Sequence, residues 1–152
     1  MNGENMEIRE IKDNKKKYLS LLLLADEQED MIDKYIEKGT MYVLDDDGVK
    51  CECVITDEGN DILEIKNIAT ESDCQGKGYG KKLIEFIASK YKEQYSILQV
   101  GTGDSPLTIP FYEKCGFIRT HIVKNFFTDN YDHPIYEGGV QLVDMIYLQK
   151  KM

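Results

Sequence analysis

The sequence predicts a single α/β (α+β) domain over residues 1–152, with about seven strands and about four helices. Apolar residues recur at every second position around the hairpin signal Asp47-Gly48, which is typical of antiparallel strands. They recur at every third or fourth position from Tyr79 to Tyr91, which is typical of an amphipathic helix. A glycine-rich run, Gly76 to Gly80, joins the two patterns.

The N-terminal half predicts a strand, two helices and three strands. We expect the strands at 7–11, 41–44, 49–56 and 62–69, and the helices at 14–23 and 29–36. Asp26 and Glu29 have the spacing of a capping box for the second helix, which Gly39 would end. In the strand at 49–56, Glu52 falls between apolar positions, so this strand is predicted to be half-buried.

The C-terminal half predicts a helix, a strand, a short helix and two strands. After the helix at 79–91, a strand is expected at 97–100. Ser105-Pro106 is typical of an N-cap followed by a first helical residue, with a kink near Pro110 and an end at Gly116. The last strands are expected at 117–127 and 142–148, with a turn-rich stretch, 128–139, between them.

Composition excludes several classes of function. The net charge of -9 argues against nucleic-acid binding through a broad basic face. No apolar run approaches the roughly 20 residues of a membrane span, and a signal-peptide pattern is absent, so we expect a cytoplasmic protein without a membrane partner. The four cysteines include no C-x-x-C pair and only two histidines occur, so no metal site is expected.

The junction at 75–80 is a candidate anion site. Glycines let the backbone turn tightly and approach a ligand, and the first N–H groups of a helix lack internal partners. A strand, glycine loop and helix start are therefore suited to a pyrophosphate. The Rossmann pattern requires a glycine where Lys81 stands, and a Walker A loop counted from Gly76 fails at Lys81-Lys82-Leu83.

Two motifs together resemble one family. Residues 75–80 fit the form Q/R-x-x-G-x-G/A, and residues 111–117 resemble F-Y-x-x-x-G-F. On these motifs and the element order, the chain resembles the GNAT family of acetyl-CoA-dependent N-acetyltransferases. The resemblance implies the GNAT acyl-CoA N-acyltransferase fold, with a central mixed, mostly antiparallel sheet. It also implies direct acetyl transfer from acetyl-CoA to a primary amine of a small molecule or protein, in a ternary complex without metal.

The same resemblance assigns the cofactor-binding residues. The backbone groups of Ile68, Ala69 and Thr70 are expected to pair with the pantetheine arm. The phosphates are expected at the loop and helix start, formed by Gln75, Gly76, Lys77, Gly78, Tyr79, Gly80 and Lys81. Ser105 stands where the family commonly has asparagine, and a serine can still hydrogen-bond the cofactor.

Two residues are expected to be catalytic. Tyr112 occupies the position of the family's general acid, where a phenol can protonate the leaving CoA thiolate. Glu64, eleven residues before Gln75, matches the general-base glutamate of histone-acetylating relatives. Lys66 lies on the same strand face, and pairing with it would make Glu64 a poorer base. An ion-paired structural glutamate is thus the alternative.

The stretch 128–139 is the candidate acceptor side. Tyr131, His133, Tyr136 and Glu137 have the aromatic and acidic character that holds an ammonium group. A surface loop or a homodimer contact is the alternative for this stretch. For the whole chain, the alternative is a non-catalytic acyl-CoA-binding or regulatory module. The acceptor, the general base and the oligomeric state are left open by the sequence.

Overall fold

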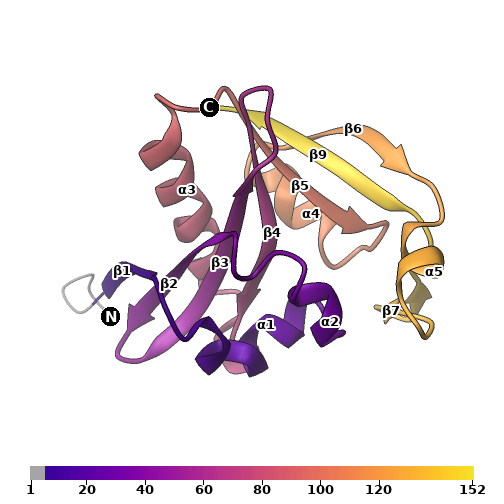
Figure 1. Cartoon of the computed structure of the whole chain (residues 1–152), viewed down its shortest axis with the longest axis horizontal. Helices are drawn as coiled ribbons and strands as arrows, with labels where there is room; N and C mark the ends of the chain where they lie inside the picture. Colours follow the sequence, from indigo (N-terminus) through magenta and orange to yellow (C-terminus); the bar gives the residue numbers. More distant parts are fainter. Residues whose placement is uncertain (1–5) are drawn as a thin grey trace.

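The computed structural model describes residues 6–152 and contains a seven-stranded sheet of order β1-β2-β3-β4-β5-β9-β6 (Figure 1). Among the described strands of this sheet, only β4 and β5 pair in parallel; the other neighbours are antiparallel. The predicted mixed, mostly antiparallel sheet is therefore confirmed. The described part of the chain has no helix that combines the length and apolar character needed to cross a bilayer.

The elements follow the predicted order, with two additions near the C-terminal end. The strands are β1 (Met6–Ile11), β2 (Thr40–Asp46), β3 (Val49–Asp57), β4 (Ile62–Thr70), β5 (Ile97–Gly103), β6 (Ile118–Val123), β7 (Tyr136–Glu137), β8 (Val140–Gln141) and β9 (Met145–Lys151). The α-helices are α1 (Leu19–Ala25), α2 (Glu29–Ile32), α3 (Tyr79–Tyr91), α4 (Ile109–Lys114) and α5 (Phe126–Asn130). The additions are α5 and the separate β7–β8 hairpin.

Helices cover both faces of the sheet, as Figure 1 shows. On one face, α3 and α4 bury residues such as Leu83 and Tyr112 against the central strands. On the other face, Leu22 of α1 and Ile32 of α2 pack on β2 and β3. The prediction of a half-buried β3 is wrong for this reason: Glu52, expected to face solvent, is fully buried.

The capping box predicted for the second helix is also wrong. Asp26 ends α1, and α2 starts after Gln28. The Asp26 carboxylate instead accepts hydrogen bonds from the hydroxyls of Tyr35 at 3.0 Å and Tyr131 at 2.7 Å. A long-range contact has therefore replaced a local one.

The predictions for the C-terminal half need three corrections. Helix α4 follows Thr108 rather than Ser105, and Pro110 lies in its first turn, where a proline causes no kink. Residues 126–127, expected in a strand, begin α5. Strand β9 begins at Met145, later than expected, and lies between β5 and β6.

Candidate active site

The two parallel strands at the centre of the sheet separate partway along their length. The ladder joins residues 62–65 of β4 to residues 97–100 of β5, whereas β4 continues to Thr70 and β5 to Gly103. Beyond the ladder, β4 pairs only with β3 and β5 only with β9 in the described residues. The peptide groups of Ile68, Ala69 and Thr70 on the β5 side therefore face the opening, where the sequence predicts the pantetheine arm.

The glycine loop has the backbone that the sequence predicts. Gly76 and Gly78 have φ angles of 79° and 86°, in the left-handed region that other residues adopt at a cost. A Cβ added to either would meet no atom within 4 Å. The loop thus presents an open backbone surface at the start of α3, a 13-residue helix with exposed Lys77, Lys81 and Lys82 at its N-terminal end. Such a surface suits an anionic ligand.

Gly80 brings this loop against α4. A Cβ at Gly80 would lie 3.1 Å from Cζ of Phe111, so the absence of a side chain permits this close packing. The loop's other side chains bind the protein itself. The Tyr79 hydroxyl donates to Asp46 at 2.6 Å, which raises the pKa of Tyr79 to about 12, and the Gln75 amide donates to the Thr70 carbonyl at 3.3 Å.

Tyr112 follows Phe111 on α4, so the two sequence motifs meet in space. Its ring packs edge-on against Phe111 and Phe117, with centroid distances of 5.2 and 5.8 Å. The side chain is 7% exposed. Burial, together with the nearby Cys53, Glu137 and Glu52 side chains, raises the pKa of Tyr112, so the phenol keeps its proton throughout the physiological range.

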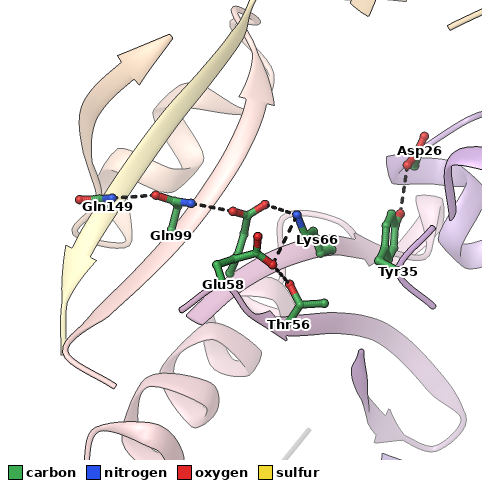
Figure 2. Close-up of polar contacts among 8 residues, drawn as sticks. Asp26, Tyr35, Thr56, Glu58, Lys66, Gln99 and Gln149 are labelled. Atoms are coloured by element: carbon green, nitrogen blue, oxygen red, sulfur yellow. Dashed lines mark hydrogen bonds and ion pairs between the residues drawn. The ribbon is translucent and has the colours of Figure 1, made fainter. Parts of the chain in front are cut away.

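Glu64 lies in a continuous polar chain across the sheet, part of which Figure 2 shows. Its carboxylate accepts a hydrogen bond from Gln99 at 2.6 Å and pairs with Lys66 at 2.8 Å. Gln149 donates to Gln99, and Lys66 lies 3.7 Å from Glu58. The Lys66 pairing, which the sequence offers as the alternative to a catalytic role, is therefore present, and both Glu64 oxygens have protein partners.

Residues 131–137 bridge two other parts of the molecule. The Tyr131 hydroxyl binds Asp26, and His133 lies 3.5 Å from Glu27, so this stretch contacts the loop between α1 and α2. The hydrogen bond from His133 to Asp132 is the main cause of a raised His133 pKa. Tyr136, by contrast, is 61% exposed.

The far end of the same stretch approaches α4. A Cβ at Gly138 would lie 3.4 Å from Leu107, two residues after Ser105 in the loop before α4. Burial raises the pKa of Glu137, and the Ser105 hydroxyl opposes that effect. Ser105 itself is buried and accepts a hydrogen bond from the Leu107 N–H at 3.1 Å. The predicted residues Ser105, Tyr112 and Glu137 therefore come together, whereas Tyr131 and His133 lie on the α1–α2 side.

Sequence reasoning missed two buried polar residues of the sheet, Glu52 and Asn67. Across residues 6–152, the buried side-chain polar atoms without a hydrogen-bond partner are both carboxylate oxygens of Glu52, Oδ1 of Asn67 and Oε2 of Glu137. All four atoms are oxygens, and the amide oxygen of Asn67 can only accept a hydrogen bond. One signal was available in the sequence: Glu52 lies on a strand that is predicted between two other strands. Either face of such a strand can be covered by other elements, so its polar residues need not face solvent.

A covalent route through cysteine is not favoured by the geometry. The four cysteines are buried and free. Cys115, which lies in the α4 motif, has a pKa raised mainly by burial, which disfavours the reactive thiolate. Within residues 6–152, no group of three or more histidine, cysteine or acidic side chains has an arrangement that could hold a metal ion.

Comparison with known proteins gives one consistent result. A family model described as Acetyltransferase (GNAT) domain matches residues 37–119. The chain is 34% identical over 151 residues to a Bacillus subtilis protein named as the uncharacterized N-acetyltransferase YvbK, covering 97% of each chain.

Two solved structures are similar over nearly the whole length. A GNAT family acetyltransferase from Elizabethkingia anophelis with acetyl-CoA bound has a TM-score of 0.91 and 35% identity, covering 98% of this chain and 99% of that one. A Bacillus cereus protein described as an IAA acetyltransferase has a TM-score of 0.89 and 37% identity, covering 97% and 99%.

Proposed function

Because the chain belongs to the GNAT family of acetyltransferases, we propose that it transfers acetyl from acetyl-CoA directly to a primary amine in a ternary complex. It is an acyltransferase with acetyl-CoA as its co-substrate. What we propose beyond this activity is that the acceptor is a primary amine and that the transfer is direct.

One observation carries the proposal: the glycine loop and Tyr112 meet where β4 and β5 separate. The close packing of Gly80 on Phe111 fixes the distance between the phosphate-binding end and the phenol. The free backbone edge of 68–70 lies between them, and an extended pantetheine arm can pair with it as another strand would. The thioester would then end near Tyr112.

The residues have distinct roles in this reaction. Amides at the start of α3, with Lys77 and Lys81 nearby, bind the phosphates and hold the donor in place. The neutral amine attacks the thioester carbonyl, the C–S bond breaks, and the Tyr112 phenol protonates the departing sulfur. The raised pKa of Tyr112 ensures that its proton is present when sulfur leaves.

Glu64 stays the sequence-based candidate for the general base. The burial of Glu64 on the sheet supports a role as the base. Its contacts with Lys66 and Gln99 support a different role, in which Glu64 holds the other side chains of the polar chain in position. Measuring kcat and the melting temperature of Glu64→Gln would separate these two roles. Loss of a base lowers kcat, whereas loss of a positioning residue also lowers the stability of the protein.

The proposal is tested by a turnover screen with acetyl-CoA and a broad panel of primary amines, followed by Tyr112→Phe on the best acceptor. The substitution keeps the ring packing and removes the proton, so kcat should fall by about 100- to 10,000-fold. Acetyl-CoA affinity should change little, since the proton is needed only in the transition state.

Tyr95→Phe is a matched control, because the Tyr95 hydroxyl donates to Asp57, the last residue of β3, and not to a residue of α4. It should retain the parental kcat. CoA release by Tyr112→Phe at the parental rate would refute the general-acid role. Acetyl-CoA binding without turnover of any amine would favour a non-catalytic module instead.

A further inference from the structure

Buried polar oxygens without partners lie on the central sheet and on β7. Four side-chain oxygens of Glu52, Asn67 and Glu137 have no hydrogen-bond partner, and no side-chain nitrogen of residues 6–152 is in the same condition. An unpartnered buried polar atom is costly, by about 1–3 kcal/mol for a neutral group. When the two carboxyls are ionised, all four oxygens are acceptors, so a ligand that satisfied them would have to bring donors, and a primary ammonium brings three.

Glu52 and Asn67 are neighbours on one face of the sheet. Strand β3 pairs Glu52 with Ala69 and Val54 with Asn67, so alternation places all four side chains on the same face. Glu52 and Asn67 are then diagonal neighbours, with Cα atoms roughly 7–8 Å apart. Their side chains are 0% and 3% exposed.

The orientation of the Asn67 amide is fixed by its donors. Its Nδ2 donates to the Leu22 carbonyl and to the Tyr35 hydroxyl oxygen, each at 3.1 Å. Tyr35 in turn donates to Asp26, as Figure 2 shows, so its oxygen has to accept from Asn67. Both amide hydrogens are used on the α1–α2 side, and Oδ1 is therefore left to accept from elsewhere.

Glu52 and Asn67 lie close to the β4 edge where the acetyl donor, acetyl-CoA, is proposed to bind. Ala69, directly opposite Glu52, belongs to the β4 edge that is free beyond the β4–β5 ladder. The Glu52 carboxyl is close enough to raise the pKa values of Tyr112 on α4 and Tyr35 beside α2, and those of its strand neighbours Cys51 and Cys53. Glu52 thus lies on the α1–α2 face of the sheet, with its carboxyl near enough to influence the phenol of the proposed general acid.

Resting on the proposed function, we infer that Glu52 and Asn67 form the subsite for the reacting nitrogen of a cationic primary amine, with Glu52 as its general base. Asn67 Oδ1 accepts one N–H and orients the nitrogen, and Glu52 accepts another. Glu64, whose oxygens are bound by Lys66 and Gln99, acts as a positioning residue of the polar chain.

Glu52 and Tyr112 together account for every proton in the reaction. An N–H bond of the ammonium breaks as an O–H bond forms on Glu52, and the freed lone pair attacks the thioester carbon. The C–S bond breaks, sulfur leaves with the electron pair and takes the Tyr112 proton, and the nitrogen's second surplus proton restores Tyr112. Glu52 returns its proton to solvent. Burial raises the pKa of Glu52 well above its usual range, so the free protein favours the neutral acid, and Glu52 has to lose that proton before it can act as the base. An ammonium group beside Glu52 favours the charged form, so amine binding promotes the carboxylate that the step requires.

Glu52→Gln tests the inference, with Glu93→Gln as a matched control on an exposed residue after α3. The variant removes the base but keeps the shape, and its amide can donate to Asn67 Oδ1. We expect kcat/KM for the amine to fall about 100- to 10,000-fold, with acetyl-CoA affinity unchanged and the melting temperature equal to or above the parental value. A purely structural carboxyl would instead lower the melting temperature, so an unfolded or destabilised variant overturns the inference.

The failure of this inference can be distinguished from failure of the proposed function. If the parent acetylates amines and Glu52→Gln retains kcat/KM within about threefold, the inference fails and the proposed function stands. If the parent acetylates none, calorimetry with n-butylammonium and phenethylammonium on the protein–CoA complex decides. Binding that Glu52→Gln weakens at least about tenfold supports the subsite. Equal binding to both proteins, or binding to neither, overturns it.

Discussion

Gly78 provides a direct test of how the loop receives acetyl-CoA. Its φ of 86° places it in the left-handed region, and an added Cβ would meet no atom within 4 Å. Gly78→Ala should therefore fold, because its only cost in the free protein is backbone strain. That strain is about 1–2 kcal/mol, which corresponds to a loss of roughly 2–8 °C in melting temperature for a chain of this size.

The effect on the liganded protein should be separate and additional. At 100 times its Kd, acetyl-CoA stabilises the parent by about 2.7 kcal/mol. The new methyl group would occupy the open side of the loop, where the phosphates approach the backbone. A tenfold increase in Kd would reduce the stabilisation to about 1.4 kcal/mol at the same ligand concentration.

Gly59→Ala is the matched control for this measurement. Gly59 has a φ of 80° and also has no atom within 4 Å of an added Cβ, but it lies in the β3–β4 turn. Thermal melts of both variants with and without acetyl-CoA should show the same strain cost and different ligand shifts. If Gly78→Ala keeps the full parental shift, as Gly59→Ala should, the loop is not the phosphate site.

Two further predictions concern the stretch 131–137. Replacing Tyr136 and Glu137 with alanine should raise the KM of a cationic amine by roughly tenfold or more, through loss of a charged hydrogen bond, and leave acetyl-CoA affinity unchanged; equal losses for both ligands in steady-state kinetics would contradict an acceptor role. Because the folded pKa of His133 is raised, its pairing with Asp132 and Glu27 stabilises the protein below the unfolded pKa of about 6.5 and is lost as pH rises through the folded pKa. His133→Asn should therefore lower the melting temperature at roughly pH 6 and not at roughly pH 9, and a difference that persists at the higher pH would show that the ion pairs are not its cause.

The elements with strong periodic patterns could be predicted from the sequence. The α3 helix was expected at 79–91 and is Tyr79–Tyr91, because its apolar face repeats over more than three turns. The Asp47-Gly48 turn likewise joins β2 to β3, with positive φ at both residues. In both cases, local sequence and tertiary packing favour the same structure.

Predictions failed where a distant partner outweighed a local signal. Asp26 has the spacing of a cap, but Tyr131 lies 105 residues further along the chain and no local pattern reveals that hydrogen bond. A helix could start at either of two prolines, after Ser105 or after Ile109. The second start is observed, because it buries Ile109 and Tyr112 in the core.

The candidate site could be predicted in its motifs but not in its buried acceptors. The glycine loop and Tyr112 were identifiable because their spacing is distinctive. Glu52 has the alternation of a solvent-facing residue, and only the packing of α1 over the sheet shows that it is enclosed. A one-dimensional pattern reports which residues share a strand face, and it does not report what covers that face.

The position of β9 has a consequence for the order in which the molecule can be assembled during translation. Strand β5 borders β4 on one side, and in the described sheet β6 pairs only with β9. The ribosome makes residues 145–151 after every other described strand, so β6 and the outer edge of β5 await their shared neighbour until β9 has been made. The part of the sheet from β1 to β5 can therefore form on a nascent chain before the part made of β9 and β6.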